Sequence, residues 1–183
     1  LRCRVCGAPE AVVPRSYCEQ CFGPLESIYD YALLRESLTR ELIERRRGIF
    51  RFLELLPLDR EPAFGQDVGD TPLLRAPRLG KALGSDDLWL TNAAVNAPTL
   101  SFKDRVVAVA LAKAIEFGFD TVGCASTGNL ANSTAAHAAQ AGIRCFVMIP
   151  HDLEPGKVLG SPIFGPTMVP IPGPYHDGNP LCT

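Results

Sequence analysis

The sequence predicts an α/β protein built around a parallel sheet. Residues 121–125 and 144–149 are short apolar runs typical of buried strands, and residues 130–141 between them are mostly small residues at helical spacing. A strand, a helix and a strand in this order form a βαβ unit, which makes the strands parallel and the crossover right-handed. With 183 residues, of which 46% are hydrophobic, the chain is long enough to bury a core.

In chain order, the sequence divides into three predicted segments. Residues 1–28 are rich in cysteine and lack apolar periodicity, residues 29–62 form a helical linker region, and residues 63–183 carry the α/β pattern. In the linker region, leucine and isoleucine recur at helical spacing until two prolines interrupt the pattern. These positions are Leu34, Leu38, Leu42 and Ile43, followed by Pro57 and Pro62.

Further elements are expected within the α/β segment. A long helix should start at Ser101, with Asp104 three residues on as in a capping box, and should end at Gly118. Its expected apolar stripe comprises Phe102, Val106, Val109, Ala110, Ala114 and Phe117. The shorter candidates are a strand at 88–90, a helix at 156–164 and a strand at 168–171.

Charge and hydropathy argue against two classes of partner. The formal net charge is -2 and the pI is about 5.9, so no basic surplus indicates binding to nucleic acid or to an anionic membrane. No apolar run is long enough to cross a bilayer, and the chain opens without the apolar stretch of a secretory signal. We therefore expect a cytoplasmic protein.

Four of the seven cysteines form two closely spaced pairs, Cys3-x-x-Cys6 and Cys18-x-x-Cys21, with eleven residues between the pairs. Each pair can chelate one ion on a tight turn, and two such turns complete a tetrahedral site. Zinc is the expected metal, although four thiolates also suit iron. The alternative is four free thiols in an unstructured segment. A metal here would be structural, because the segment is too small to bury a core of its own.

Lys103 lies in the first turn of the predicted long helix. The positive end of a helix dipole disfavours an ammonium group, which would lower the pKa of this lysine and suit it to bond a carbonyl cofactor. On position alone, a solvated surface lysine is the simpler interpretation.

The loop Ser126-Thr127-Gly128-Asn129 follows a predicted strand and opens a predicted helix. Backbone N–H groups at such a turn bind carboxylates and phosphates, and Gly128 would let a ligand approach closely. A plain capped turn explains the loop equally well.

Taken together, the two motifs resemble a known family. The pattern from Pro98 to Arg105 (P-T-x-S-F-K-D-R), followed by S-T-G-N at 126–129, is similar to threonine synthases, a branch of the fold type II pyridoxal-phosphate enzymes of the tryptophan synthase β group. The resemblance extends to residues 18–26, 70–74 and 152–157 and so runs through nearly the whole chain.

The resemblance implies an incomplete three-layer parallel sheet of the fold type II enzymes, preceded by the four-cysteine zinc knuckle. It implies that Lys103 forms the covalent link to pyridoxal 5'-phosphate and that Asn129 contacts the cofactor's phenolic oxygen. Ser126, Thr127 and Gly128 would bind the substrate carboxylate. The expected reaction converts O-phospho-L-homoserine and water to L-threonine and phosphate, and relatives suggest a homodimer.

Several departures from the family pattern keep alternatives open. Thr91 and Ala93 stand where relatives carry a basic and an acidic residue, and Leu100 stands where many have glycine. Relatives also run on well past this length, so we expect a fragment, a truncated gene product or a decayed copy with weak cofactor binding. The alternatives are a serine or threonine dehydratase, a cysteine synthase relative, or a non-catalytic zinc-binding remnant. For His137, a packing or surface role is a better expectation than contact with a substrate phosphate.

Overall fold

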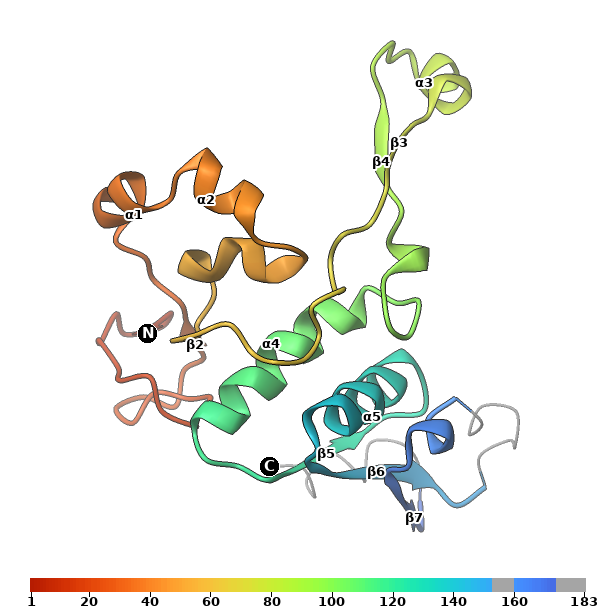
Figure 1. Ribbon diagram of the computed structural model, residues 1–183. Helices are drawn as coiled ribbons and strands as arrows, with labels where there is room; N and C mark the ends of the chain where they lie inside the picture. The colour runs from red at the N-terminus through yellow and green to blue at the C-terminus, as the bar shows by residue number, and fades with distance from the viewer. Residues whose placement is uncertain (153–159, 174–183) are drawn as a thin grey trace.

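The structure is a computed structural model that describes residues 1–152 and 160–173 (Figure 1). The predicted helix at 156–164 falls partly outside these residues, and its described end is the short 3-10 helix η3 (Pro162–Phe164). Proline occupies the first position of η3, where its missing N–H costs nothing.

The predicted parallel sheet is confirmed. It consists of β5 (Thr121–Ala125), β6 (Arg144–Pro150) and β7 (Thr167–Ile171), all parallel and in that spatial order. The helix α5 (Asn129–Ala141) connects β5 to β6 and ends at Gly142, whose left-handed conformation closes the last turn. The register pairs Val122 with Cys145 and Phe146 with Thr167.

The central strand β6 shows which face of the sheet the helices cover. Cys145, Val147 and Ile149 are buried in one cluster with alanines of α5. Phe146 and Met148 alternate with them and are only half-buried. Because side chains alternate between faces along a strand, the described helices cover one face of the sheet. The described residues therefore supply the sheet and the helical layer on one side of it.

The helix α4 (Lys103–Glu116) packs against α5 (Figure 1), but the predicted apolar stripe was assigned to the wrong face. Phe102, Val106 and Ala110 are exposed. The helix is apolar around most of its circumference, so periodicity alone did not identify the side that packs. The buried positions are Asp104, Val107, Ala108, Leu111 and Ala112.

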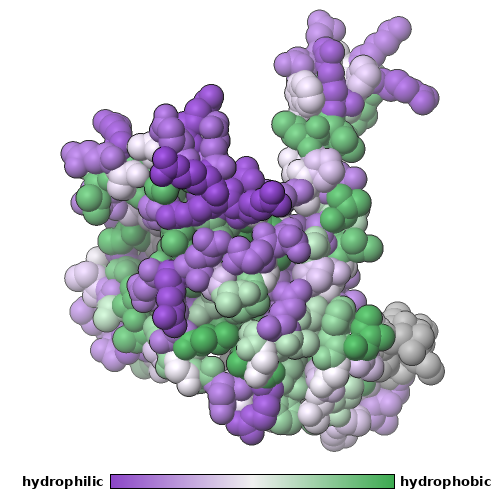
Figure 2. All heavy atoms as spheres, in the orientation of Figure 1, coloured by the Kyte–Doolittle hydropathy of each residue, from purple (hydrophilic) through white to green (hydrophobic). Residues whose placement is uncertain are grey.

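The linker region contains three short helices. They are α1 (Tyr31–Ser37), α2 (Arg40–Arg45) and the 3-10 helix η1 (Ile49–Leu55). Asp30 caps α1 and Thr39 caps α2, so each polar cap starts a new helix. Figure 2 shows hydrophilic residues gathered over α1 and α2.

The linker leucines behave as their spacing predicted. All four predicted positions are half-buried: Leu34 in α1, Leu38 at its C-terminal cap, and Leu42 and Ile43 in α2. Phe50 of η1 is fully buried and joins the main core.

A separate antiparallel hairpin projects from the body of the protein (Figure 1). It pairs β3 (Leu73–Arg75) with β4 (Trp89–Thr91), and the helix α3 (Pro77–Leu83) lies at its tip. The predicted strand at 88–90 is thus present one residue later in the chain, outside the parallel sheet. No helix in the described ranges is both long and apolar enough to cross a membrane.

Candidate functional site

Lys103 is the first residue of α4, as its position in the sequence predicted. Its backbone N–H donates to Ser101 Oγ at 3.1 Å, and its side chain is half-buried with Nζ 4.7 Å from the centre of the Phe102 ring. The lysine amine therefore stands at the open end of a 14-residue helix.

The predicted capping box at this helix start is wrong. Ser101 Oγ accepts from Lys103 and not from Asp104, whose N–H instead bonds the Ser101 carbonyl at 3.3 Å. The Asp104 carboxylate turns inward, where it accepts from the backbone N–H of Thr99 at 3.1 Å and from its hydroxyl at 2.8 Å. Burial of this carboxylate explains the difference, because a buried charge needs several hydrogen-bond donors.

The loop lies where the sequence predicted, with Ser126, Thr127 and Gly128 between β5 and α5, although Asn129 is already the first residue of α5. Ser126 is buried, and its hydroxyl accepts weakly from the Gly128 N–H at 3.4 Å. Gly128 occupies the cap position of α5 without a side-chain cap, and a Cβ there would have no heavy atom within 4 Å. The start of α5 thus offers backbone N–H groups and open space, which suits a phosphate or a carboxylate.

One hydrogen bond joins the beginning of α4 to the beginning of α5. Ser133 Oγ, one turn into α5, donates to the Asp104 carboxylate at 2.7 Å. Lys103 precedes Asp104 directly, and Asn129 precedes Ser133 by four residues, a rise of about 6 Å along a helix. The first turns of α4 and α5, which carry Lys103 and the amide-bearing motif, therefore lie next to each other. An amine, hydroxyls and free N–H groups around open space fit a carbonyl cofactor that carries a phosphate.

Two further polar side chains near these helix starts have packing roles. His137 is fully buried, which confirms the packing expectation, and its Nδ1 lies 2.9 Å from the Ser133 carbonyl. Because the carbonyl can only accept, Nδ1 carries a proton, and burial lowers the pKa of the ring, which favours its neutral form. Arg105 donates to the Gly69 carbonyl at 3.3 Å and to the Thr71 hydroxyl at 2.7 Å, which attaches the segment before β3 to α4.

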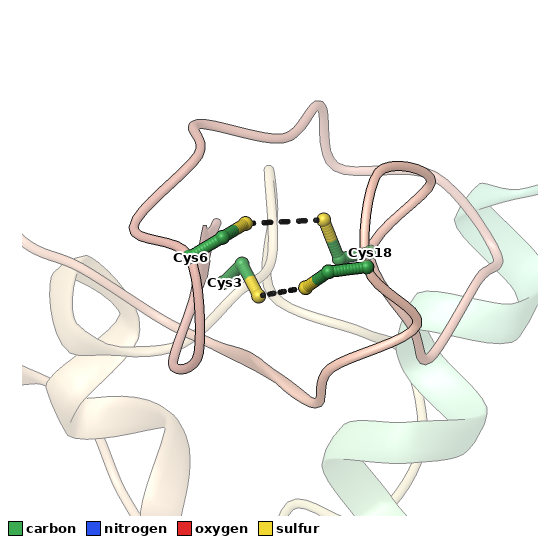
Figure 3. A group of neighbouring side chains, drawn as sticks. Cys3, Cys6 and Cys18 are labelled. Atoms are coloured by element: carbon green, nitrogen blue, oxygen red, sulfur yellow. Dashed lines mark hydrogen bonds between the residues drawn. The ribbon is translucent and has the colours of Figure 1, made fainter.

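The four paired cysteines form a second, separate cluster. β1 (Arg2–Cys3) pairs antiparallel with β2 (Leu25–Glu26) and closes the segment that carries them. Figure 3 shows Cys3, Cys6 and Cys18 directed toward one another. The sulfurs of all four cysteines, including Cys21, lie within 4.8 Å of one another.

The sulfur spacing and hydrogen bonds suit a tetrahedral metal ion. Cys3 Sγ is 3.4 Å from Cys21 Sγ, and Cys6 Sγ is 3.7 Å from Cys18 Sγ. Metal–sulfur bonds of about 2.3 Å place tetrahedral sulfurs about 3.8 Å apart. Backbone N–H groups also point at the sulfurs, from Val5 to Cys3 at 3.4 Å and from Gln20 to Cys18 at 3.3 Å.

The cluster brings thiols together in unequal surroundings. Backbone N–H groups, that of Cys6 foremost, lower the pKa of Cys3 to about 6. Burial raises the pKa of Cys18 to about 12, since a thiolate there loses its hydration. A cation at the centre would stabilise all four thiolates, so the residues present fit a bound zinc or iron ion.

The parallel α/β fold, with a lysine at the start of one helix and an N–H-lined turn at the start of the next, is compatible with an enzyme that holds a carbonyl cofactor on a lysine. Residues 65–182 match the family model described as "Pyridoxal-phosphate dependent enzyme". The chain belongs to this family of pyridoxal-phosphate-dependent enzymes.

Within this family, the chain is similar in sequence to threonine synthases. The chain is 37% identical over 179 residues to a threonine synthase of Methanocaldococcus jannaschii, covering 96% of this chain and 44% of that protein. It is 36% identical over 179 residues to a threonine synthase of Methanosarcina acetivorans, with 97% and 44% covered. The chain is therefore threonine synthase-like and spans less than half of the length of these relatives.

A solved structure supports the fold. The processed form of threonine deaminase isoform 2 from Solanum lycopersicum aligns with a TM-score of 0.56 at 19% identity, covering 61% of this chain and 31% of that one. At this identity the likeness shows the fold alone.

Sequence reasoning missed Asp104 and Ser133 as partners. The signal was present in the run Asn132-Ser133-Thr134, which is polar inside an otherwise alanine-rich helix. Polar residues on the buried side of a helix need partners, and the nearest buried carboxylate belongs to α4.

Proposed function

We propose that this chain carries the lysine-bearing part of a pyridoxal-phosphate-dependent lyase that converts O-phospho-L-homoserine and water to L-threonine and phosphate. The observation that supports the proposal is the Ser133–Asp104 hydrogen bond, which joins the residue after Lys103 to the helix that follows the Ser126–Asn129 motif. Similarity to threonine synthases over 96% of the chain supports the choice of reaction.

The residues around the starts of α4 and α5 have distinct proposed roles. When bound, the cofactor supplies an electron sink for the substrate's reacting carbon. Lys103 Nζ would hold the cofactor and then take and return a proton. The side-chain amide of Asn129 would donate to the cofactor's ring oxygen. The Ser126 and Thr127 hydroxyls and the N–H groups at the start of α5 would orient the substrate carboxylate.

Trapping the cofactor on its lysine tests the proposal. The chain is mixed with pyridoxal 5'-phosphate, reduced with borohydride and digested, and the modified lysines are found by mass spectrometry. We expect the adduct on Lys103, and we expect Lys103→Arg to remove it. Lys81→Arg, on exposed α3, is the matched control and should leave the Lys103 adduct unchanged. Equal labelling of Lys103 and Lys81 would reject Lys103 as the cofactor lysine.

The choice of substrate is tested separately. The bound cofactor's visible absorbance responds to amino acids that enter the site. O-phospho-L-homoserine should perturb it at lower concentration than L-serine or L-threonine. A stronger response to L-serine or L-threonine would favour a dehydratase instead.

We also propose that the four paired cysteines hold a structural zinc ion. Their sulfurs lie within 4.8 Å of one another. A shared metal ion explains why the two cysteine pairs, which are separated in the sequence, converge on one point. Because four thiolates complete one tetrahedral site, metal analysis of the purified chain should find about one zinc ion per chain. A chain that is folded and free of both zinc and iron would refute the site.

A further inference from the structure

We propose that Asp104 is a positioning residue for Lys103, an inference that rests on the proposed cofactor site. Asp104 is fully buried, although it directly follows an amine that must remain accessible. Its carboxylate receives hydrogen bonds from two segments, the loop before Lys103 and the helix after the Asn129 loop. One side chain thereby holds both halves of the site together.

The bonds around Asp104 account for its burial. Thr99 donates its backbone N–H to Oδ2 at 3.1 Å and its hydroxyl to Oδ1 at 2.8 Å. Ser133 donates its hydroxyl to Oδ1 at 2.7 Å. An ionised carboxylate is buried without large cost only when such donors surround it. A carboxylate that merely complements the helix dipole needs neither burial nor a partner on a second helix.

Geometry connects these bonds to Lys103. Neighbouring residues of a helix are about 100° apart around its axis, at 3.6 residues per turn. A carboxylate fixed to α5 therefore fixes the direction in which the Lys103 side chain leaves the same turn. The fixed direction is defined relative to the Asn129 loop, because Ser133 lies one turn further along α5.

The test separates positioning from stability by comparing matched variants of Thr99. Thr99→Val keeps the shape of the side chain and removes its hydroxyl, whereas Thr99→Ser keeps the hydroxyl. Asp104→Asn keeps the size of the carboxylate and removes its charge. Each variant is mixed with pyridoxal 5'-phosphate well below its own unfolding temperature, and the borohydride-trapped adduct on Lys103 is measured relative to that on Lys81.

We expect Asp104→Asn and Thr99→Val to lower cofactor affinity at Lys103 by about tenfold, the loss typical of a hydrogen bond to a charged group. Thr99→Ser should retain native labelling. A merely structural role would lower the unfolding temperature of Asp104→Asn but leave the Lys103 adduct of the folded protein unchanged, and that result would overturn the inference alone. Failure of the unmodified chain to form the Lys103 adduct would overturn the proposed function and this inference together.

Discussion

Removal of the proposed zinc ion from the cysteine cluster should unfold residues 1–28 while leaving the α/β part folded. In this segment, the only buried hydrophobic side chains are Cys3 and Cys18, which are themselves proposed ligands. Structural zinc contributes about 10–16 kcal/mol in small zinc-binding peptides. Because no apolar core offsets such a loss, chelation should remove most of the order of this segment.

Hydrogen exchange measures this loss amide by amide. The two cysteine turns contain backbone bonds from Cys3 to Ala8 at 2.9 Å and from Cys18 to Gly23 at 2.9 Å. After treatment with a strong chelator, these amides should exchange at nearly the rate of an unfolded peptide. Amides of α5 should stay protected, because that helix packs on the sheet.

Two cysteine variants, one inside and one outside the cluster, test whether the metal holds the segment. Cys18→Ser removes one ligand and should reproduce the effect of the chelator without chelation. Cys124→Ser changes a cysteine of β5 outside the cluster and should keep the metal. If the chelated chain kept its protection at Cys3 and Cys18, the segment would be held by contacts other than the metal, and the structural role would be wrong.

Three further predictions concern backbone conformation and pH. Leu100 has a φ of 59°, a left-handed conformation that costs a non-glycine residue about 1–2 kcal/mol, so Leu100→Gly should raise the free energy of unfolding in urea by up to about 1 kcal/mol. Gly65 has a φ of 69°, so Gly65→Ala should lower that free energy by about 1–2 kcal/mol in the same assay. Burial, partly opposed by the Ser133 carbonyl and the Asp104 charge, lowers the pKa of His137, so the unfolded chain binds a proton that the native chain does not. Stability should therefore fall as the pH drops below about 6.5, and His137→Gln should flatten this fall in urea midpoints measured at several pH values.

The left-handed backbone at Leu100 explains why many relatives were expected to carry glycine at this position. Glycine adopts this conformation without cost. The leucine side chain is 66% exposed, so it does not gain packing in exchange. The loop that leads to Lys103 thus retains the conformation suited to glycine although its residue has changed.

Local patterns predicted the elements of the sheet well. The runs at 121–125 and 144–149 are strands because several apolar residues in succession suit a sheet that is buried on one or both faces. Gly142 ended α5 as expected, since glycine closes a helix in the left-handed conformation at no steric cost. These features depend on residues that are close together along the chain, so the sequence alone is enough to predict them.

Features that depend on distant partners were predicted less well. Asp104 was interpreted as a capping residue because Ser101 lies three residues before it, yet its shortest hydrogen bond goes to Ser133, 29 residues away. The strand at 88–90 was recognised, but its antiparallel partner β3 could not be inferred from its own residues. Tertiary contacts decided both cases, and a single sequence shows such contacts only as unexplained polar or apolar positions.

Small side chains explain how Asp104 and Ser133 come within hydrogen-bonding distance. Asp104 and Ala108 are four residues apart and share one face of α4, and Ser133 and His137 share one face of α5 in the same way. Gly65 lies beside both faces, where an added Cβ would be 3.4 Å from the Ala108 Cβ and 3.5 Å from the His137 ring. A larger residue at Ala108 would push these elements apart and lengthen the bond to Ser133. The buried carboxylate would then lose a donor, so the close packing of α4 and α5 and the placement of the lysine amine depend on the same contact.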